Sequence, residues 1–533
     1  MHRTHRPTVF RRPSLLASLP GIAALMLAGC GGSGGAPEPA PGRGSLVVSP
    51  PAPVADFTAA QLAARLAADP QGQALLQLAG APRCGVEARA LHYRTVGAQG
   101  EATDSTGVLM RPTGTDAACQ GARPIVLYAH GTATDRRYNL AAVADAGNPA
   151  TPESSLLAAM YAAQGFTVVA PNYAGYDASA LAYHPYLNAD QQSKDMIDAL
   201  TAARTALQAL GTPDAGPLFL TGYSQGGHVA MATHRALQAQ GTPVAASAPI
   251  SGPYALAAMG DALFYGSVNL GATVFAPLIV TSYQQAYGNL YRSTSDIYSS
   301  FYSQGIDRLL PATVPVDTLV AQGRLPASAM FDSTPPQAPP GSGLQRLLDG
   351  ITPPSQPAGQ AALFAMGFGP RPLLNNNARL GYLMDAMANP DGAAPALTTG
   401  LPAAAPADPL RQAFKRNDLR DWSPRSPVLL CGGNADPIVF YGLNTQTMAR
   451  LWTPPSALAP ATTPVVALDV DSQATGAGDP YAALKAGFAQ AKASVAAAGG
   501  ANAVLASYHA GLVPPFCSAA ARAFFQSALA ARS

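Results

Sequence analysis

Residues 218–233 read LFLTGYSQGGHVAMAT, and this stretch decides the fold. A short apolar strand at 218–220 runs into a G-x-S-x-G motif centred on Ser224, and a helix is expected to follow. A serine on such a tight turn brings its flanking chains together, so Gly222 and Gly226 supply the small positions that the turn needs. The motif predicts that Ser224 is an exposed nucleophile at the start of a helix. The alternative is a glycine-rich turn whose serine has no chemical role.

Short apolar strands alternate with helical segments on both sides of this motif. Such alternation is typical of an α/β protein with a mostly parallel sheet that is covered by helices on both faces. The sequence predicts that this core consists of residues 56–253 and 408–533. The alternation breaks at Ser251-Gly252-Pro253, and residues 254–407 are rich in aromatic side chains and prolines. We interpret 254–407 as a helical cap or lid insertion; a separate helical domain is the alternative.

The general base is predicted to be His509. In open parallel sheets, functional residues gather at the carboxyl ends of the strands. Of the eight histidines, only His509 lies beyond the insertion, and it is expected to follow an apolar strand at 504–508. It would accept the Ser224 proton and return it to the leaving group. The alternative is a histidine in a solvent-exposed loop.

The acid of the predicted triad is Asp436. It follows the expected strand 427–431 and a glycine-rich loop, and the chain order serine, acid, histidine is that of many serine hydrolases. Asp436 would fix the tautomer of the histidine and stabilise its charged form. Asp469 and Asp471, on or just after the next strand, are competitors. For each carboxylate the alternative role is to form a turn or cap a helix.

Two backbone N–H groups are predicted to form an oxyanion hole. One belongs to Gln225, next to the nucleophile, and the other to Thr132, which follows His130-Gly131 at another strand end. Losing one such donor typically raises the reaction barrier by about 3 to 4 kcal/mol. His130 itself is interpreted as a structural residue of its turn.

Five cysteines are present, and Cys30 belongs to the leader sequence. The other four allow three pairings in an oxidising compartment. We favour Cys84–Cys119, which is local to the first strands, and Cys431–Cys517, which would tie together the loops that carry the predicted acid and base. Neither pair has the spacing of a zinc site, and no metal is predicted.

The N-terminus has the pattern of an export signal. Basic residues precede an apolar stretch at 15–28 that is too short for a comfortable membrane span, and it ends in Leu27-Ala28-Gly29-Cys30. This ending resembles the bacterial lipobox, in which the cysteine is lipidated; ordinary secretory cleavage is the alternative. Residues 1–30 are therefore predicted to be a lipoprotein signal peptide. Residues 31–55 are predicted to be a flexible linker, and Gly31 favours the outer membrane.

Composition and charge limit the remaining partners. The 533 residues are 48% hydrophobic and 12% charged, which is enough for a large core. The net charge is +2, and no basic run occurs outside the N-terminus, so no nucleic-acid partner is predicted.

Four groups of residues together resemble the bacterial α/β-hydrolases akin to secretory lipases, the lipase-A-like family. They are His130-Gly131-Thr132, Val169-Ala170-Pro171-Asn172-Tyr173 with Gly175, the turn at 222–227, and residues 434–436 with Asn444-Thr445. The resemblance covers about residues 84–253 and 417–530, and it implies an α/β-hydrolase fold in which the insertion carries the lid. Position 172 commonly holds Asp in the family, whereas this sequence has Asn172.

The sequence predicts an exported, lipid-anchored serine esterase or lipase that forms an acyl-enzyme and needs no metal or organic cofactor. The aromatic insertion would bind an apolar acyl group, and opening of the lid would control access. A serine peptidase of the same fold is an alternative, because the triad chemistry does not distinguish an ester from an amide. A non-catalytic surface binding protein on this scaffold is a third possibility.

Overall fold

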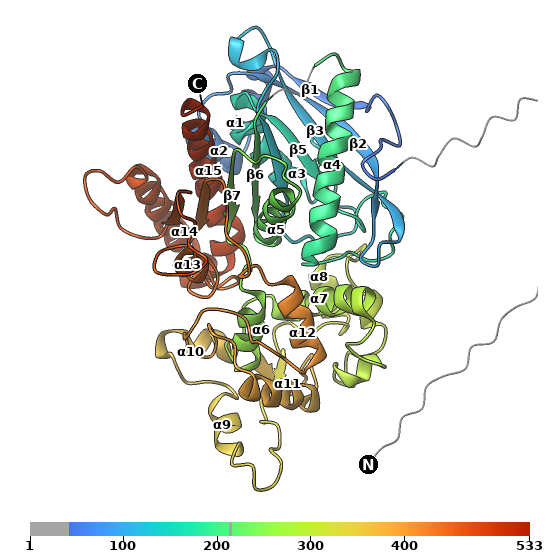
Figure 1. Ribbon diagram of the computed structural model, residues 1–533, viewed down its shortest axis with the longest axis vertical. Coiled ribbons are helices and arrows are strands. Elements are labelled where there is room, and N and C mark those ends of the chain that lie inside the picture. Colours follow the sequence, from blue (N-terminus) through green and yellow to red (C-terminus); the bar gives the residue numbers. More distant parts are fainter. Residues whose placement is uncertain (1–41, 213–215, 533) are drawn as a thin grey trace, which may run out of the picture. The chain divides into compact units, whose positions relative to one another are not determined.

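The computed structural model of the chain describes residues 42–212 and 216–532 (Figure 1). Two units are distinguished, residues 1–41 and residues 42–533, and all the elements below belong to the second unit. The predicted signal peptide, its lipidation site Cys30 and the first part of the linker lie outside the described residues. In the described part of the chain, no helix combines the length and the apolar character needed to cross a bilayer.

A nine-stranded sheet forms the centre of the second unit, in the order β1-β2-β3-β5-β4-β6-β7-β10-β11. The strands from β1 to β3 pair antiparallel, and so do β3 and β5. From β5 to β11, the neighbouring strands are parallel. The bounds are β1 Pro53–Phe57, β2 Gly85–Val96, β3 Ala102–Thr113, β4 Ile125–Ala129, β5 Thr167–Pro171, β6 Leu218–Tyr223, β7 Ala246–Ile250, β10 Val428–Gly432 and β11 Val465–Asp469.

Helices pack against the sheet in two groups (Figure 1). The helices α4 and α5 contact each other and the central strands, whereas α2, α3 and α15 contact one another. The strands β4, β5 and β7 are buried along their whole length, as expected for parallel strands between two helical layers. The helices outside the segment between β7 and β10 are α1 Ala59–Ala67, α2 Pro70–Ala79, α3 Thr151–Met160, α4 Ala189–Ala209, α5 Gln225–Ala239, α13 Thr445–Leu451, α14 Ala482–Ser507 and α15 Val513–Ala530.

Between β7 and β10 the chain leaves the sheet and forms a run of helices, drawn below the sheet in Figure 1. Aromatic and aliphatic side chains from this run build a hydrophobic core of their own, which includes Phe264, Tyr283 and Tyr382. The two short strands β8 Phe331–Asp332 and β9 Phe368–Gly369 pair within it. Its helices are α6 Leu256–Phe264, α7 Ala272–Tyr287, α8 Val316–Ala321, α9 Gln345–Gly350, α10 Ala358–Ala365, α11 Asn376–Ala388 and α12 Pro409–Asn417.

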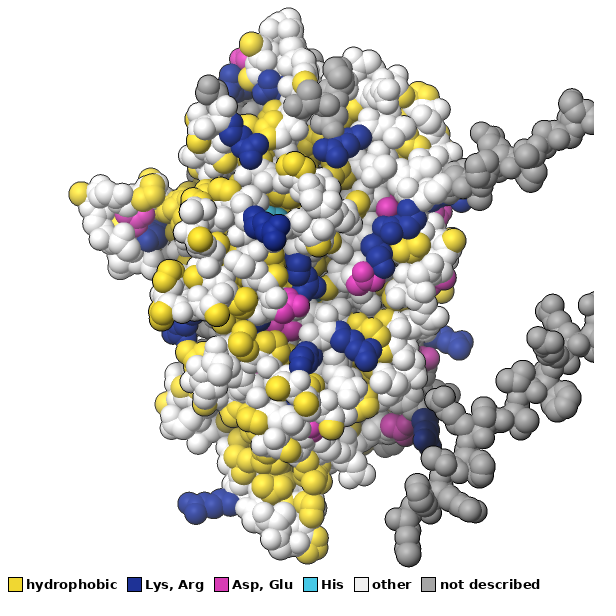
Figure 2. All heavy atoms as spheres, in the orientation of Figure 1, with side chains coloured by type: hydrophobic (Ala, Val, Ile, Leu, Met, Phe, Trp, Pro, Cys, Tyr) yellow, Lys and Arg dark blue, Asp and Glu magenta, His cyan; other side chains and the backbone are white. Residues whose placement is uncertain are grey.

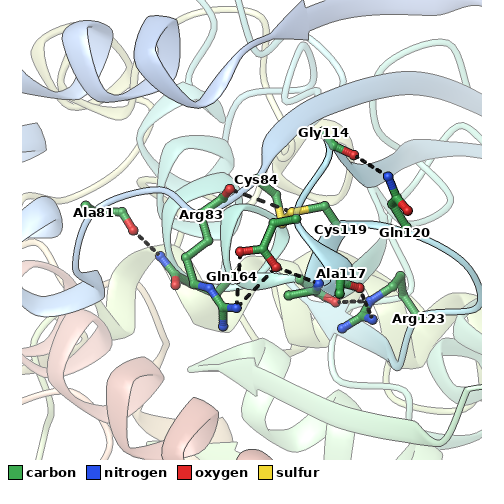
Figure 3. Close-up of a disulfide and its surroundings, with 12 residues drawn as sticks. Ala81, Arg83, Cys84, Gly114, Ala117, Cys119, Gln120, Arg123 and Gln164 are labelled. Atoms are coloured by element: carbon green, nitrogen blue, oxygen red, sulfur yellow. Dashed lines mark hydrogen bonds and ion pairs between the residues drawn. A yellow bond between two sulfur atoms is a disulfide. The ribbon is translucent and has the colours of Figure 1, made fainter.

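The disulfide Cys84–Cys119 fastens the beginning of β2 to the loop after β3 (Figure 3). Cys119 lies in the 3₁₀ turn η1, Ala117–Cys119, and both cysteines are buried. The turn is also held by Gln120, whose side chain donates to the carbonyl oxygen of Gly114 at 3.3 Å (Figure 3). A second disulfide joins Cys431 to Cys517, so both favoured pairings occur.

Two predictions about local structure are wrong. The flexible linker was expected to reach residue 55, yet β1 already pairs with β2 from Pro53, and Leu46 forms a bridge with Tyr93. The strand expected at 504–508 is helical: α14 reaches Ser507, and a π-helical turn, η5 Tyr508–Leu512, carries His509. An apolar run of this length fits a helix as well as a strand. Here Tyr508 packs against the ring of Phe488, which in turn contacts Phe516.

On the face shown in Figure 2, Lys and Arg side chains are scattered among uncharged ones instead of forming one basic patch. This distribution agrees with the low net charge of the sequence.

Candidate active site

Ser224 lies on the turn between β6 and α5 in a strained conformation, with φ 59° and ψ −122°. A positive φ is uncommon for a residue other than glycine and is typical of a functional turn. The turn depends on its glycines: a Cβ atom on Gly226 would lie 1.9 Å from the carbonyl oxygen of Ala129, and one on Gly222 would lie 2.4 Å from that of Gly226. The steric reason for the G-x-S-x-G spacing is thus present in the structure.

His509 connects the serine to a carboxylate. Its Nε2 lies 2.8 Å from Ser224 Oγ, although the two residues are 285 positions apart in the sequence. Its Nδ1 lies 2.7 Å from Asp436 Oδ2. A carboxylate accepts hydrogen bonds, so Nδ1 carries the proton and Nε2 accepts from the serine hydroxyl. All three side chains are buried, with 6%, 5% and 3% exposure for Ser224, Asp436 and His509.

Asp436 is held in place by the backbone of its own loop. Its Oδ1 accepts from the N–H groups of Ile438 at 2.9 Å and Val439 at 3.0 Å, which leaves Oδ2 for His509. The two competing carboxylates serve other groups. Asp469 accepts from the side chain of Asn434 at 2.8 Å, and Asp471 accepts from the Tyr508 hydroxyl at 2.7 Å.

The two predicted oxyanion donors come from different strand ends. Gln225 is the first residue of α5, and Thr132 follows β4. Neither backbone N–H has an acceptor within residues 42–212 and 216–532, so both are free to donate to a ligand. The Thr132 side chain is occupied, because its hydroxyl lies 2.7 Å from that of Tyr186.

Two buried histidines lie near these donors, and the sequence predicts no catalytic role for either. His184 Nε2 lies 2.7 Å from the side-chain nitrogen of Gln225, and His130 Nδ1 lies 2.6 Å from the carbonyl oxygen of Gly131. The sequence places His184 in a loop 41 residues before Gln225 and gives no signal for this contact. For His130, its position directly before Gly131-Thr132 is the available signal.

Two cavities of different size adjoin the site. The first, of about 80 Å³, is bounded by Ser224 and Gln225 and otherwise mainly by apolar side chains of the insertion. The second, of about 860 Å³, is bounded by Thr132, Tyr223 and side chains of α2, α3 and α14. Its lining combines aromatic rings with polar groups; among the latter are Gln71, Gln77, Glu153, Gln490 and Ser494.

Comparison with known proteins places this geometry in context. No family model matches the sequence. No curated protein matches it either. Among solved structures, a ligand-bound form of the rice cell wall degrading esterase LipA from Xanthomonas oryzae matches with a TM-score of 0.59 and 26% identity, covering 86% of this chain and 98% of that chain. Another structure of LipA matches with a TM-score of 0.60 and 25% identity over the same shares.

A Legionella pneumophila protein matches more weakly in sequence, at 18% identity, with a TM-score of 0.56 over 90% of this chain and 96% of that chain. At that identity it supports the fold alone. The mostly parallel nine-stranded sheet, its helical layers and the match to LipA together establish the fold class and the resemblance to secretory lipases that the sequence motifs implied. The chain is an esterase- or lipase-like α/β-hydrolase whose structure resembles that of the secretory lipase (lipase-A-like) family.

Proposed function

We propose that this chain hydrolyses carboxylic esters through an acyl-enzyme intermediate on Ser224. The observation that carries the proposal is the unbroken line of hydrogen bonds from Ser224 Oγ through the ring of His509 to Asp436. In this arrangement His509 takes the hydroxyl proton while Ser224 Oγ attacks the ester carbonyl carbon. The negative oxygen of the tetrahedral intermediate is then stabilised by the N–H groups of Gln225 and Thr132.

Loss of the alcohol completes the first half of the reaction, and water then takes part in the second half. His509 gives its proton to the departing alcohol as the carbon–oxygen bond breaks, which leaves the acyl group on Ser224. Water then attacks the acyl-enzyme while His509 accepts its proton, and the acid is released as Ser224 regains its hydrogen. Asp436 keeps Nδ1 protonated and stabilises the positive ring in both halves.

The apolar cavity next to Ser224 supports an ester with a short acyl group. An engineered cavity of about 150 Å³ binds benzene, which has six carbon atoms. A space of about 80 Å³ corresponds on this scale to a chain of about three to four carbon atoms. The acyl group would lie against apolar side chains such as Phe275, Ile279 and Val280 of α7.

The larger cavity supports a bulky, polar alcohol portion. It reaches Thr132 and Tyr223, and the Tyr223 ring lies 5.1 Å from that of His509, which must protonate the leaving alcohol. The Xanthomonas relative is a rice cell wall degrading esterase. From the two cavities together, we propose a short-chain ester of a polar alcohol, such as a cell-wall polymer, as the substrate of the present chain.

Residues 254–407 are proposed to act as the cap of the site, because most of the walls of the small cavity come from them. Opening of this cap would let the acyl group enter, and closure would exclude water from the carbonyl carbon. The core would then consist of residues 53–253, beginning with β1, and residues 408–533.

The first experiment measures hydrolysis of p-nitrophenyl butyrate by the wild type and by Ser224→Ala. The variant is expected to lose turnover and labelling by a fluorophosphonate, whereas Ser527→Ala, an exposed serine of α15, keeps both. Full activity of Ser224→Ala would refute the proposal. Equal rates on butyryl p-nitroanilide and the ester would favour a peptidase, and failure of the wild type to take the label would favour a binding protein.

The second experiment varies the acyl chain and the alcohol separately. We expect kcat/KM to be highest for butyrate or a shorter ester and to fall for octanoate. Phe275→Ala should raise the octanoate rate relative to butyrate, whereas Phe301→Ala, an exposed aromatic side chain of the same insertion, should not. Ser494→Trp in the large cavity should slow a butyrylated oligosaccharide more than p-nitrophenyl butyrate. A constant rate across these pairs would contradict the assignment of the two cavities.

Export and lipidation at Cys30 are a further part of the proposal. They are supported by the sequence pattern around Cys30 and by the two disulfides, which suggest an extracytoplasmic compartment. Mass spectrometry of the mature protein should find a lipid on an N-terminal Cys30, and Cys30→Ser should release the protein from membranes. An unmodified mature N-terminus elsewhere in the chain would contradict lipidation.

A further inference from the structure

The motif Asn172-Tyr173-Ala174-Gly175-Tyr176 supplies no residue to the proposed triad or oxyanion hole. It nevertheless keeps a strained backbone: φ is 66° at Tyr173 and 96° at Gly175. A Cβ atom on Gly175 would lie 2.2 Å from the carbonyl oxygen of Tyr183, so only glycine fits there. Such strain persists where the surrounding structure requires it, and here the segment presents two carbonyl groups to buried histidines.

The first of these histidines holds the side chain of Gln225. His184 Nδ1 lies 3.0 Å from the carbonyl oxygen of Ala174, which can only accept, so the ring proton is on Nδ1. The unprotonated Nε2 then accepts from the amide of Gln225 at 2.7 Å. Burial lowers the pKa of His184 to about 3, which keeps the ring neutral and able to accept. His184 thus fixes the residue whose backbone N–H is one predicted oxyanion donor.

The second histidine holds the peptide that carries the other donor. His130 Nδ1 lies 2.6 Å from the carbonyl oxygen of Gly131, and its Nε2 lies 3.0 Å from that of Asn172. Burial lowers the pKa of His130, so the ring is neutral and has one N–H. A nitrogen without a hydrogen would be repelled by a carbonyl oxygen at 2.6 Å, so we assign the hydrogen to Nδ1. The Gly131 carbonyl and the Thr132 N–H form one peptide unit, so donation to the oxygen fixes its orientation and strengthens the N–H as a donor.

Both histidines pack on the same tyrosine. The ring centroid of Tyr173 lies 4.1 Å from that of His130 and 5.6 Å from that of His184, and both pairs are stacked. The Tyr173 hydroxyl donates to the carbonyl oxygen of His130 at 3.1 Å. The other face of the His130 ring stacks on Tyr138 at 4.4 Å. These contacts place the supports of both oxyanion donors in one rigid cluster.

We propose that His130 and His184, held by the segment 172–176, are positioning residues that aim the Thr132 and Gln225 N–H groups at the oxyanion. This inference rests on the proposed ester hydrolysis. It makes Nδ1 the acting atom of His130 and Nε2 the acting atom of His184. Because these groups act on the intermediate and not on the bound ester, their loss should lower kcat and leave KM nearly unchanged.

Asparagine and glutamine variants separate the two ring nitrogens. An asparagine amide reaches the place of Nδ1, and a glutamine amide reaches the place of Nε2. His130→Asn should therefore keep a kcat at least about tenfold above that of His130→Gln, and His184→Gln should exceed His184→Asn by a similar factor, since a donor misplaced by about 1 Å costs up to about 100-fold. Affinity for a butylboronic acid, which forms a tetrahedral adduct with the serine, should fall in parallel with kcat/KM.

Asparagine is thus the better substitute at position 130 and glutamine the better one at position 184. A general loss of packing does not produce this reversal. Equal kcat values within each pair, or a change in KM alone, would overturn the inference. If a histidine variant does not fold by circular dichroism, Gln225→Leu tests the same contact by removing only the amide that His184 holds; an undiminished kcat in a folded Gln225→Leu protein would overturn the role of His184. Failure of the wild type to hydrolyse any ester would instead refute the proposed function.

Discussion

Cys431 and Cys517 are joined by a disulfide that ties the strand before Asp436 to the helix after His509. Both cysteines are fully buried, and their Cα atoms are 5.7 Å apart. The bond closes a loop between positions 86 residues apart, which also contains both the acid and the base of the proposed triad. It therefore limits how far the carboxylate and the imidazole can separate when the protein fluctuates.

Removing this disulfide should lower both stability and activity. In the chain-entropy model a loop of this length contributes about 4 to 5 kcal/mol to the free energy of unfolding. Urea unfolding of the double variant Cys431→Ser with Cys517→Ser should show a loss of this order, and kcat on p-nitrophenyl butyrate should fall in the fraction that stays folded. The matched control removes Cys84–Cys119, which is distant in sequence from the acid and base. That control should lose stability but keep kcat; an equal loss of kcat would contradict a specific role for Cys431–Cys517.

Replacing the proposed acid should separate it from its competitors. Asp436→Asn leaves a side chain of the same shape that no longer holds Nδ1 of His509 in its protonated form, and the equivalent change in a serine protease lowers kcat about 10⁴-fold. Asp471→Asn serves as the control, because Asp471 contacts the Tyr508 hydroxyl and Lys492 and not His509. Steady-state kinetics of the two variants should differ by at least about two orders of magnitude. A larger loss of kcat in Asp471→Asn than in Asp436→Asn would identify Asp471 as the acid of the triad.

Steric limits made one part of this site predictable from sequence. The G-x-S-x-G spacing states a local requirement, and Gly226 meets it, because a Cβ atom there would lie within 1.9 Å of the Ala129 carbonyl oxygen. Ser224 and Asp436 follow the parallel strands β6 and β10, as the sequence predicts, whereas His509 follows a helix. The π-helical turn around His509 was not predictable in the same way, because its apolar neighbours fit a strand and a helix equally well.

Contacts made by loops were beyond the reach of the sequence. His184 contacts Gln225 with one ring nitrogen and the carbonyl oxygen of Ala174 with the other, and nothing in the residues around His184 encodes these contacts. The early start of the sheet at Pro53 was missed for a related reason. A proline-rich stretch is usually a linker, but here it forms an edge strand, where a missing N–H is tolerated.

Two glycine substitutions should have opposite effects, because Gly226 lies in the tight turn at Ser224 and Gly381 does not. Gly226→Ala would push a Cβ atom into the backbone at Ala129, so the variant should lose most of its activity and several kcal/mol of stability, at or above about 4 kcal/mol. Gly381→Ala is the control: Gly381 lies exposed in α11, and a Cβ atom added to it would meet no other group within 4 Å. That variant should gain about 0.5 to 1 kcal/mol, because alanine stabilises a helix interior. Thermal unfolding and ester hydrolysis measure both effects.

Stability should fall in mild acid because a buried histidine stays neutral in the fold. His234 lies between the hydroxyls of Ser247 at 2.9 Å and Ser426 at 2.8 Å, and burial lowers its pKa to about 4. An unfolded histidine has a pKa of about 6.5, so between about pH 4 and 6.5 the unfolded chain binds more protons than the folded protein. The free energy of unfolding therefore rises with pH in this window. Lowering the pH from 7 to 5 should reduce it by about 2 kcal/mol through His234 alone.

His234→Gln tests this origin of the acid sensitivity. The variant keeps a polar side chain but has no group that titrates, so its loss of stability relative to the wild type should be about 2 kcal/mol smaller at pH 5 than at pH 7. Ser426→Ala is the control, since it removes a hydrogen bond of His234 but leaves the imidazole, and its effect should change little with pH. Urea unfolding at several pH values between about 4 and 7.5 measures these differences. If the gap between His234→Gln and the wild type were constant across that range, the acid sensitivity would be assigned instead to the other buried histidines whose pKa burial lowers, His130, His184 and His228.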